Sequence, residues 1–170
     1  MRGFECRKFW FYAFVSIAAI NARPATGESP KSPREVVERY CLFDAQGANF
    51  DSKNPYSKAI GKLLINEDEA GYDSSVVILS YRVGNATIEK GAASVMVIYE
   101  DLGTLSGGHL EQNKEAESVV FHLSRIRNSW KIDGLRILPH ISKTWVLSEL
   151  GKGQIVGRSS SSDLVRELNK

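Results

Sequence analysis

The residues best suited to chemistry lie near the end of one predicted strand. Tyr99 and Asp101 stand two positions apart in "VIYEDL" (97–102), and alternate residues of a strand point to the same face. A carboxylate beside a phenol could remove a proton next to a carbonyl group and stabilise the anion that forms. The simpler interpretation is that polar residues meet solvent where a strand ends. Tyr40, on a predicted helix, could reach the same cavity, but it also suits a core position with its hydroxyl at the edge.

The three histidines do not form a metal motif. His109, His122 and His140 fall on a predicted loop, strand and turn, without the paired spacing of a zinc site. His122 is expected on the outer face of the sheet, and His140 follows Pro139 in a turn with no evident acid or nucleophile as partner. The acidic run 67–69 lacks the alternating oxygen ligands of a calcium loop, so we interpret it as a solvated loop, with calcium binding as the alternative. We therefore expect neither a metal nor another cofactor.

The N-terminus predicts export. Residues 1–8 carry three basic side chains, residues 9–20 are apolar, and a small residue, Ala22, follows at a suitable cleavage position. These are the parts of a secretory signal peptide, which we place at residues 1–22. An uncleaved anchor is the alternative, although a membrane span needs about 20 apolar residues. The localisation expected is periplasmic or secreted, with no stable membrane span after cleavage and a polar linker at residues 23–31.

Cleavage changes the charge and cysteine content of the chain. Removing three of the 22 basic residues and one of the 20 acidic residues leaves 19 of each. A near-neutral domain without a basic stripe argues against nucleic acid as a partner. Cleavage also removes Cys6, which leaves Cys41 without a partner for an internal disulfide. Cys41 lies one turn after Val37 on an apolar helical stripe, so we interpret it as a buried structural thiol.

Two helices are expected before the first strand. The first begins with Ser32 as N-cap and Pro33 at the first helical position, and Gly47 is placed to end it. A second helix is expected from Asn54 and Pro55. Its apolar stripe consists of Tyr56, Ile60, Leu63 and Leu64.

From residue 75 onward the apolar residues alternate, as in strands. We expect strands at 75–89, 92–102, 116–126 and 130–138, with a bend at residues 84–85, a flexible loop at 103–115 and a β-bulge at Gly134. Ser142 is expected to cap a further helix that Gly151 ends. The domain therefore spans residues 32–150, and the glycine- and serine-rich residues 151–170 are expected to form a flexible tail.

The order of elements resembles that of a known superfamily. Two N-terminal helices are followed by a strand meander containing "VGNATIEKGAASVMVIYEDLG" and "SWKIDGLRI". Over residues 33–150 this is similar to the nuclear-transport-factor-two-like superfamily, especially its small exported members. The resemblance implies an α+β fold in which N-terminal helices pack on a strongly curved antiparallel sheet, a cone with a pocket at its wide end. The ketosteroid isomerases in that superfamily place an acidic base and a tyrosine–acid donor pair in the pocket, and no catalytic residue is carried over from them to this sequence.

These observations favour an exported, non-catalytic binding or accessory domain for a small apolar ligand or a protein partner of the cell envelope. The alternative is a small cofactor-independent enzyme, similar to an isomerase or dehydratase, that uses Asp101 and Tyr99. Tyr40, Tyr99 and Asp101 are the candidate ligand-binding residues. A homodimer is also expected, because several apolar residues share the outer face of the sheet and a contiguous apolar patch usually marks an interface. These residues are Met96, Ile98, Val120 and Ile126.

Overall fold

The computed structural model describes residues 30–66, 72–134, 137–153 and 161–169. The predicted signal peptide (1–22), nearly all of the predicted linker (23–31) and the acidic run at 67–69 lie outside these residues. The elements in chain order are α1 (Pro33–Asp44), α2 (Ser57–Gly61), β1 (Ser74–Glu89), β2 (Ala92–Ser106), β3 (His109–Gln112), β4 (Ala116–Ile126), β5 (Ser129–Ile132), β6 (His140–Ser142), α3 (Lys143–Gly151) and α4 (Ser161–Leu168).

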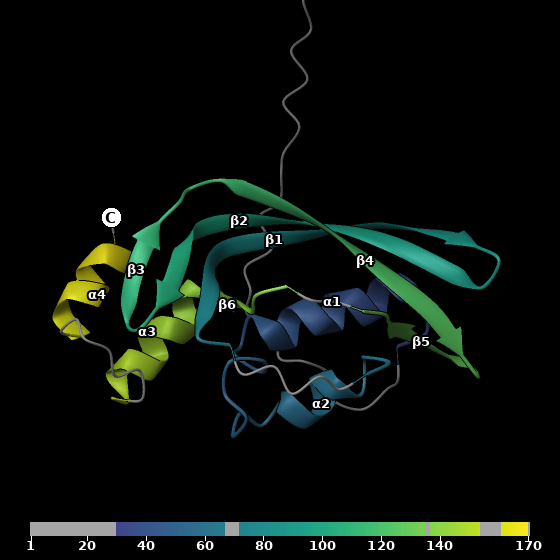
Figure 1. The fold of residues 1–170 in the computed structure, drawn as a ribbon, viewed down its shortest axis with the longest axis horizontal. Coiled ribbons are helices and arrows are strands. Elements are labelled where there is room, and N and C mark those ends of the chain that lie inside the picture. The colour runs from purple at the N-terminus through teal and green to yellow at the C-terminus, as the bar shows by residue number, and fades with distance from the viewer. Residues whose placement is uncertain (1–29, 67–71, 135–136, 154–160, 170) are drawn as a thin grey trace, which may run out of the picture.

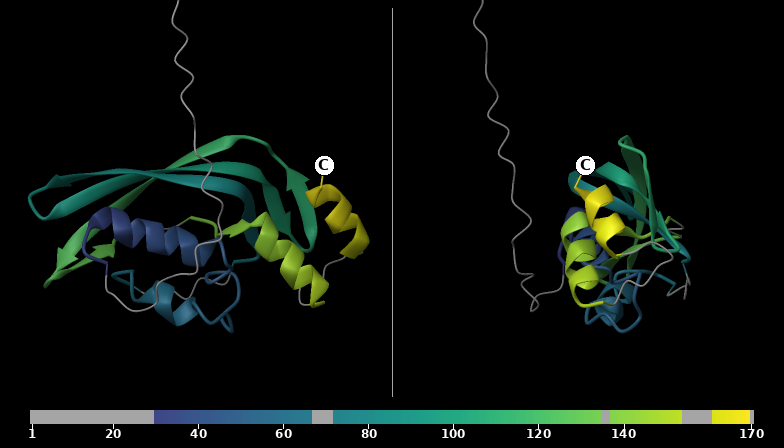
Figure 2. Two further views of the ribbon diagram at one scale, coloured as in Figure 1. Left: turned by 180° about the vertical axis from the view of Figure 1, so that it is seen from behind. Right: turned by 90° about the vertical axis from the view of Figure 1, so that its left-hand side faces the viewer.

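The structure is an α+β fold with one strongly curled sheet, which confirms the predicted fold class. The strands lie in the order β5-β4-β2-β1-β6, and β3 pairs with the far end of β2. Neighbouring strands are antiparallel except β6, which runs parallel to β1. The sheet is therefore mixed rather than wholly antiparallel. Figures 1 and 2 show α1 and α3 on its concave side.

Helix α1 begins as the sequence predicts. The Ser32 hydroxyl accepts a hydrogen bond from the backbone N–H of Glu35, and Pro33 occupies the first turn. The helix ends at Asp44, three residues before Gly47, which has a φ of 78°. The buried stripe of α1 packs on the inner face of the sheet, where the Tyr40 ring meets Phe121 edge to face at 5.4 Å.

Helix α2 is shorter than predicted. The expected cap residue Asn54 accepts a hydrogen bond from the Tyr56 N–H through its side chain, which makes a turn rather than a helix start. The helix itself begins at Ser57, whose hydroxyl donates to the carbonyl of Ala48. Side-chain hydrogen bonds of this kind compete with helical ones, and they account for the later start.

The long hairpin of β1 and β2 agrees with the prediction. Its register shifts between Val83 and Ala86, at the expected bend. The turn contains Lys90 and Gly91, with φ values of 46° and 85°. Two successive positive φ values are typical of a type I′ turn, which matches the twist of the flanking strands.

The predicted flexible loop 103–115 is wrong. Strand β2 continues to Ser106, and β3 pairs back on it after a turn at residues 107–108. The signal for this extension is apolar alternation across the glycines, because Leu105 and Leu110 pair and are both buried. They belong to a second apolar core that also contains Leu102 and residues of α3 and α4.

The prediction of a strand at 130–138 is also wrong for the second half of that range. Strand β5 ends at Ile132, and Gly134 has a φ of 61°. The predicted β-bulge at Gly134 would require strand pairing to continue to residue 138. Residues 135–136 of that stretch lie outside the described residues. Instead the chain returns to the sheet at His140 and pairs in parallel with Val76–Ile78 of β1.

The C-terminal region is more ordered than the sequence suggests. Ser142 caps α3 as predicted, accepting a hydrogen bond from the Trp145 N–H. Residues 161–168, expected to be part of a flexible tail, form α4, which buries Leu164 and Leu168 in the second core. No helix of the described part of the chain is long and apolar enough to cross a membrane.

Candidate functional site

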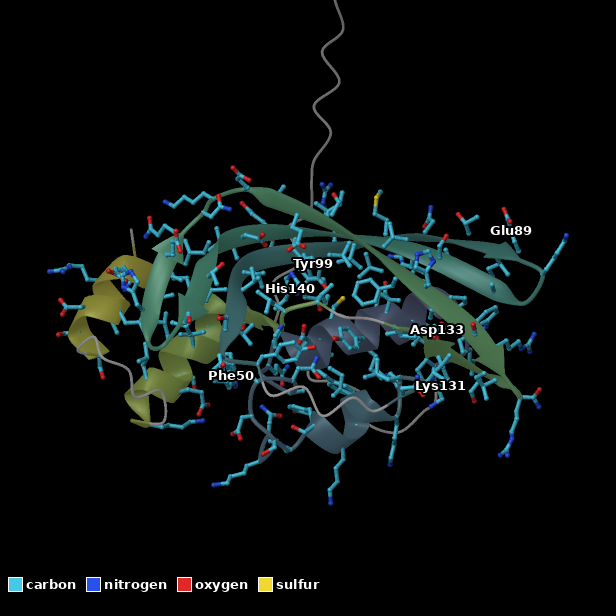
Figure 3. The ribbon with its side chains drawn as sticks, in the orientation of Figure 1. Phe50, Glu89, Tyr99, Lys131, Asp133 and His140 are labelled. Atoms are coloured by element: carbon cyan, nitrogen blue, oxygen red, sulfur yellow. The ribbon has the colours of Figure 1, made fainter. Side chains whose placement is uncertain are left out.

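Tyr99 lies in the interior, on the inner face where the alternation placed it. Its side chain is 0% exposed, because β2 presents it to the end of α1 rather than to solvent. Its ring stacks on the imidazole of His140, with centroids 3.9 Å apart and an interplanar angle of 19° (Figure 3). Its hydroxyl lies 3.3 Å from Sγ of Cys41. Burial raises the pKa of Tyr99 far above its ordinary value, so the hydroxyl stays protonated.

His140 is the residue that the sequence interpretation missed. It begins β6 instead of lying in a turn, and its side chain is 1% exposed. Its ring Nε2 lies 3.1 Å from Oε2 of Glu117, and its backbone N–H donates to Oδ2 of Asp44 at 2.9 Å. The expectation that it has no acidic partner is therefore wrong. Both partners lie far away in the chain, so the local sequence carried no signal for them.

Asp44 is the polar centre of the interior. It is 0% exposed, yet both carboxylate oxygens have donors. Oδ2 accepts from the His140 N–H, and Oδ1 accepts from the Asn49 side chain at 2.8 Å. The same Asn49 amide donates to the Tyr40 hydroxyl at 2.9 Å. Burial raises the pKa of Asp44 to about 7, and the two hydrogen bonds oppose part of that rise.

The two α1 residues singled out from the sequence face this cluster. Tyr40 and Cys41 are both buried. Desolvation by burial raises the pKa of Tyr40 well above its ordinary value and that of Cys41 to about 12. A thiol with so high a pKa is a poor nucleophile. The structure thus has Cys41 buried on the α1 stripe, as interpreted from the sequence.

Asp101 lies at the margin of the cluster. Its side chain is partly buried, and its Oδ1 atom is buried without a hydrogen-bond partner among the described residues. Burial, and to a smaller extent the negative charge of Glu117, raises the pKa of Asp101 to about 6. The carboxylates of Asp101 and Glu117 are therefore electrostatic neighbours, and the Glu117 side chain is 44% exposed.

The arrangement separates buried groups from accessible ones. Tyr99, His140 and Asp44 are fully enclosed and bound to one another, so a substrate in this conformation does not reach them. Asp101 and Glu117 remain within reach of solvent and could exchange protons with a bound molecule. In the ranges that the structure describes, no group of three or more His, Cys, Asp or Glu side chains is arranged to hold a metal ion.

The outer face of the sheet carries the apolar residues predicted to pair two copies. Met96 lies directly opposite Val120 in the ladder, and Ile98 is the next outward residue of β2. Ile126 is three outward positions beyond Val120, which is about 20 Å along the strand. The first three form one small patch, called here the outer patch (Met96, Ile98 and Val120), and Ile126 stands apart from it. Dimerisation stays a prediction.

No family model, curated protein or solved structure matches the chain. The similarity to the nuclear-transport-factor-two-like superfamily therefore remains an expectation from the sequence.

Proposed function

We propose that this protein is a non-catalytic binding or accessory domain whose ligand is a protein partner held on the outside of the sheet. The observation that carries the proposal is the filled interior. Tyr99, Phe121 and His140 are among the largest fully buried side chains. The polar groups of the inner face bond mainly to one another, which leaves the two tyrosines of the expected ligand site unavailable to a small molecule.

The outer patch supports a partner on the convex side. Met96 and Val120 are exposed large apolar side chains, and Ile98 is partly exposed beside them. Arg82 pairs with Ile98 in the ladder, and Ser94 and Ser118 complete the surroundings. An apolar centre with a polar rim is the usual anatomy of a protein interface. The patch is small for an obligate dimer, whose interfaces commonly bury about 2,000 Å² or more.

The test is affinity capture from the source cells with the wild-type domain and two variants. Ile98→Asp places a charge in the outer patch, and Glu89→Gln alters the exposed tip of the β1–β2 hairpin (Figure 3) as a matched control. We expect one stoichiometric partner that Ile98→Asp loses and Glu89→Gln retains. Equal capture by both variants would place the binding surface elsewhere. Self-association of the wild type alone, lost in Ile98→Asp, would identify a homodimer instead.

A second candidate function rests on Asp101. Its buried Oδ1 atom, which has no hydrogen-bond partner among the described residues, and its pKa of about 6 suit a general base near neutral pH. The alternative function is therefore a cofactor-independent isomerase or dehydratase in which Asp101 moves a proton, with Glu117 as its neighbour. Tyr99 is less suited to a role in it, because its hydroxyl faces the Cys41 thiol inside the core.

Proton exchange tests this second function without knowledge of the natural substrate. The protein is incubated in deuterated water with a panel of ketones and enones, and deuterium uptake next to the carbonyl is followed by mass spectrometry. An enzyme would accelerate uptake for at least one compound, and Asp101→Asn would abolish the acceleration while Glu89→Gln would not. Uptake at the buffer rate throughout the panel would count against catalysis.

A further inference from the structure

Asp44 and His140 form a buried acid–imidazole pair that joins two elements far apart in the chain. Oδ2 of Asp44 lies 4.0 Å from Nδ1 of His140, and that Nδ1 atom is buried with no hydrogen-bond partner among the described residues. The other ring nitrogen, Nε2, faces Oε2 of Glu117. A neutral imidazole whose Nε2–H donates to Glu117 leaves a lone pair on Nδ1. A proton on Asp44 would point toward that lone pair.

The pair is part of the joint between α1 and β6. Besides the bond from the His140 N–H to Asp44, the Ser142 N–H donates to the carbonyl of Ala45. Asp44 is the last residue of α1, and His140 is the first residue of β6. Any change in the charge of the pair therefore acts at the contact between α1 and the sheet.

We propose that Asp44 and His140 act as a one-proton unit: at mildly acidic pH the folded protein holds a single proton on the pair, as the unfolded chain does, and the stability of the α1–β6 joint therefore does not change with pH in that range. Each group alone would make the joint pH-sensitive, with opposite signs. The proposal does not depend on which function the domain has.

The signs follow from the direction in which burial shifts each group. Burial raises the pKa of Asp44 from 3.8 to about 7, so its contribution to stability is complete below about pH 4 and is lost as the pH rises through 7. Burial lowers the pKa of His140. Its contribution is complete above the unfolded value of about 6.5 and is lost as the pH falls.

Together the two contributions nearly cancel. Between about pH 4 and 6.5 an unfolded chain carries one proton on the pair, on His140. In the proposed unit the folded pair also carries one, on Asp44 or shared with His140. Stability depends on pH only where the two states bind different numbers of protons. The pair therefore adds almost no pH dependence in this interval.

The other ionisable groups around the pair lie on four elements. They are Tyr40 and Cys41 of α1, Tyr81 of β1, Tyr99 and Asp101 of β2, and Glu117 of β4. Burial raises the pKa of the three tyrosines and the cysteine, so all four stay neutral. Asp101 adds a slope of its own, which is the same in every variant below and cancels when each is compared with the wild type.

The experiment is urea unfolding of the full chain at pH 4.5–8 for the wild type, Asp44→Asn, His140→Gln and the double variant. Relative to the wild type, Asp44→Asn should lose stability as the pH falls from 7 to 5. His140→Gln should lose stability as the pH rises over the same interval. In each single variant, the change relative to the wild type should approach a tenfold change in the unfolding equilibrium constant per pH unit, which is the limit for one proton. The double variant and the exposed controls Glu89→Gln and His122→Gln should follow the wild type.

Two outcomes would overturn the proposal. One is that the stability of both single variants changes with pH as it does in the wild type. The other is that both single variants lose stability, relative to the wild type, in the same direction of pH change. Should a variant fail to fold, NMR titration of the wild type decides. The His140 ring should keep one protonation state from pH 5 to 6.5, while the Asp44 carboxyl carbon titrates near 7. A His140 ring that titrates alone near 6.5, the value of a free side chain, with Asp44 ionised throughout, would contradict it.

Discussion

Replacing Tyr99 with alanine is expected to destabilise the folded protein by about 3–5 kcal/mol, the cost of removing a fully buried aromatic side chain. The ring is 0% exposed and stacks on His140. Its loss leaves a cavity between β2 and β6 and removes the ring that packs on the His140 imidazole, whose other contact is the Glu117 carboxylate. Urea unfolding followed by tryptophan fluorescence measures the change.

Tyr99→Phe is the matched control for this prediction. It keeps the ring and removes only the hydroxyl, whose contact in the structure is the Cys41 thiol at 3.3 Å. We expect a loss of about 1 kcal/mol or less, since the thiol is a weak partner. Equal losses in the two variants would mean that the hydroxyl, and not the packing of the ring, is what the interior needs. A small loss in Tyr99→Ala would mean that the interior is not tightly filled.

Gly47→Ala is expected to destabilise the protein by about 2–5 kcal/mol, through two separate effects. The φ of 78° at Gly47 costs an L-residue about 1–2 kcal/mol. An added Cβ would also collide with the indole ring of Trp145, and such overpacking costs about 1–3 kcal/mol more. Trp145 in turn lies edge to face with Phe50 at 5.6 Å, so it has little freedom to withdraw. The loss is again measured by urea unfolding.

Gly91→Ala separates the two effects. Gly91 has a similar φ of 85°, but a Cβ there would meet no atom within 4 Å. We expect this variant to lose only the backbone cost of about 1–2 kcal/mol. If Gly47→Ala costs no more than Gly91→Ala, Trp145 moves freely and the contact between α3 and the turn after α1 is loose.

The sequence predicts the elements that local signals define. The cap at Ser32, the tight connection between strands 75–89 and 92–102, and the cap at Ser142 each depend on residues a few positions apart, and the structure has all three. The alternation in β4 likewise places Phe121 inside and His122 outside. These features need no knowledge of the rest of the chain, because the hydrogen bonds and the side-chain period that produce them are local.

The sequence does not predict what depends on distant contacts. Strand β6 is short, and it exists because Val76–Ile78 offers a parallel edge to His140–Ser142. Helix α4 is held by burial of Leu164 and Leu168 against the β2–β3 hairpin and α3. His140 meets Asp44 across 96 positions of the chain. Of the predicted site residues, Tyr99 and Tyr40 do converge on one cluster, but the groups that connect them, Asn49 and Asp44, carried no sequence motif.

The filled interior is tested most directly by native mass spectrometry of the domain, purified from cells without organic solvent. A domain that binds its partner on the outside should give the mass of the bare polypeptide, and solvent extraction should recover no apolar compound in stoichiometric amount. A mass increased by a small apolar molecule on most copies, released on unfolding, would contradict this. The inner face would then open to admit a ligand among Tyr40, Tyr99 and Asp101.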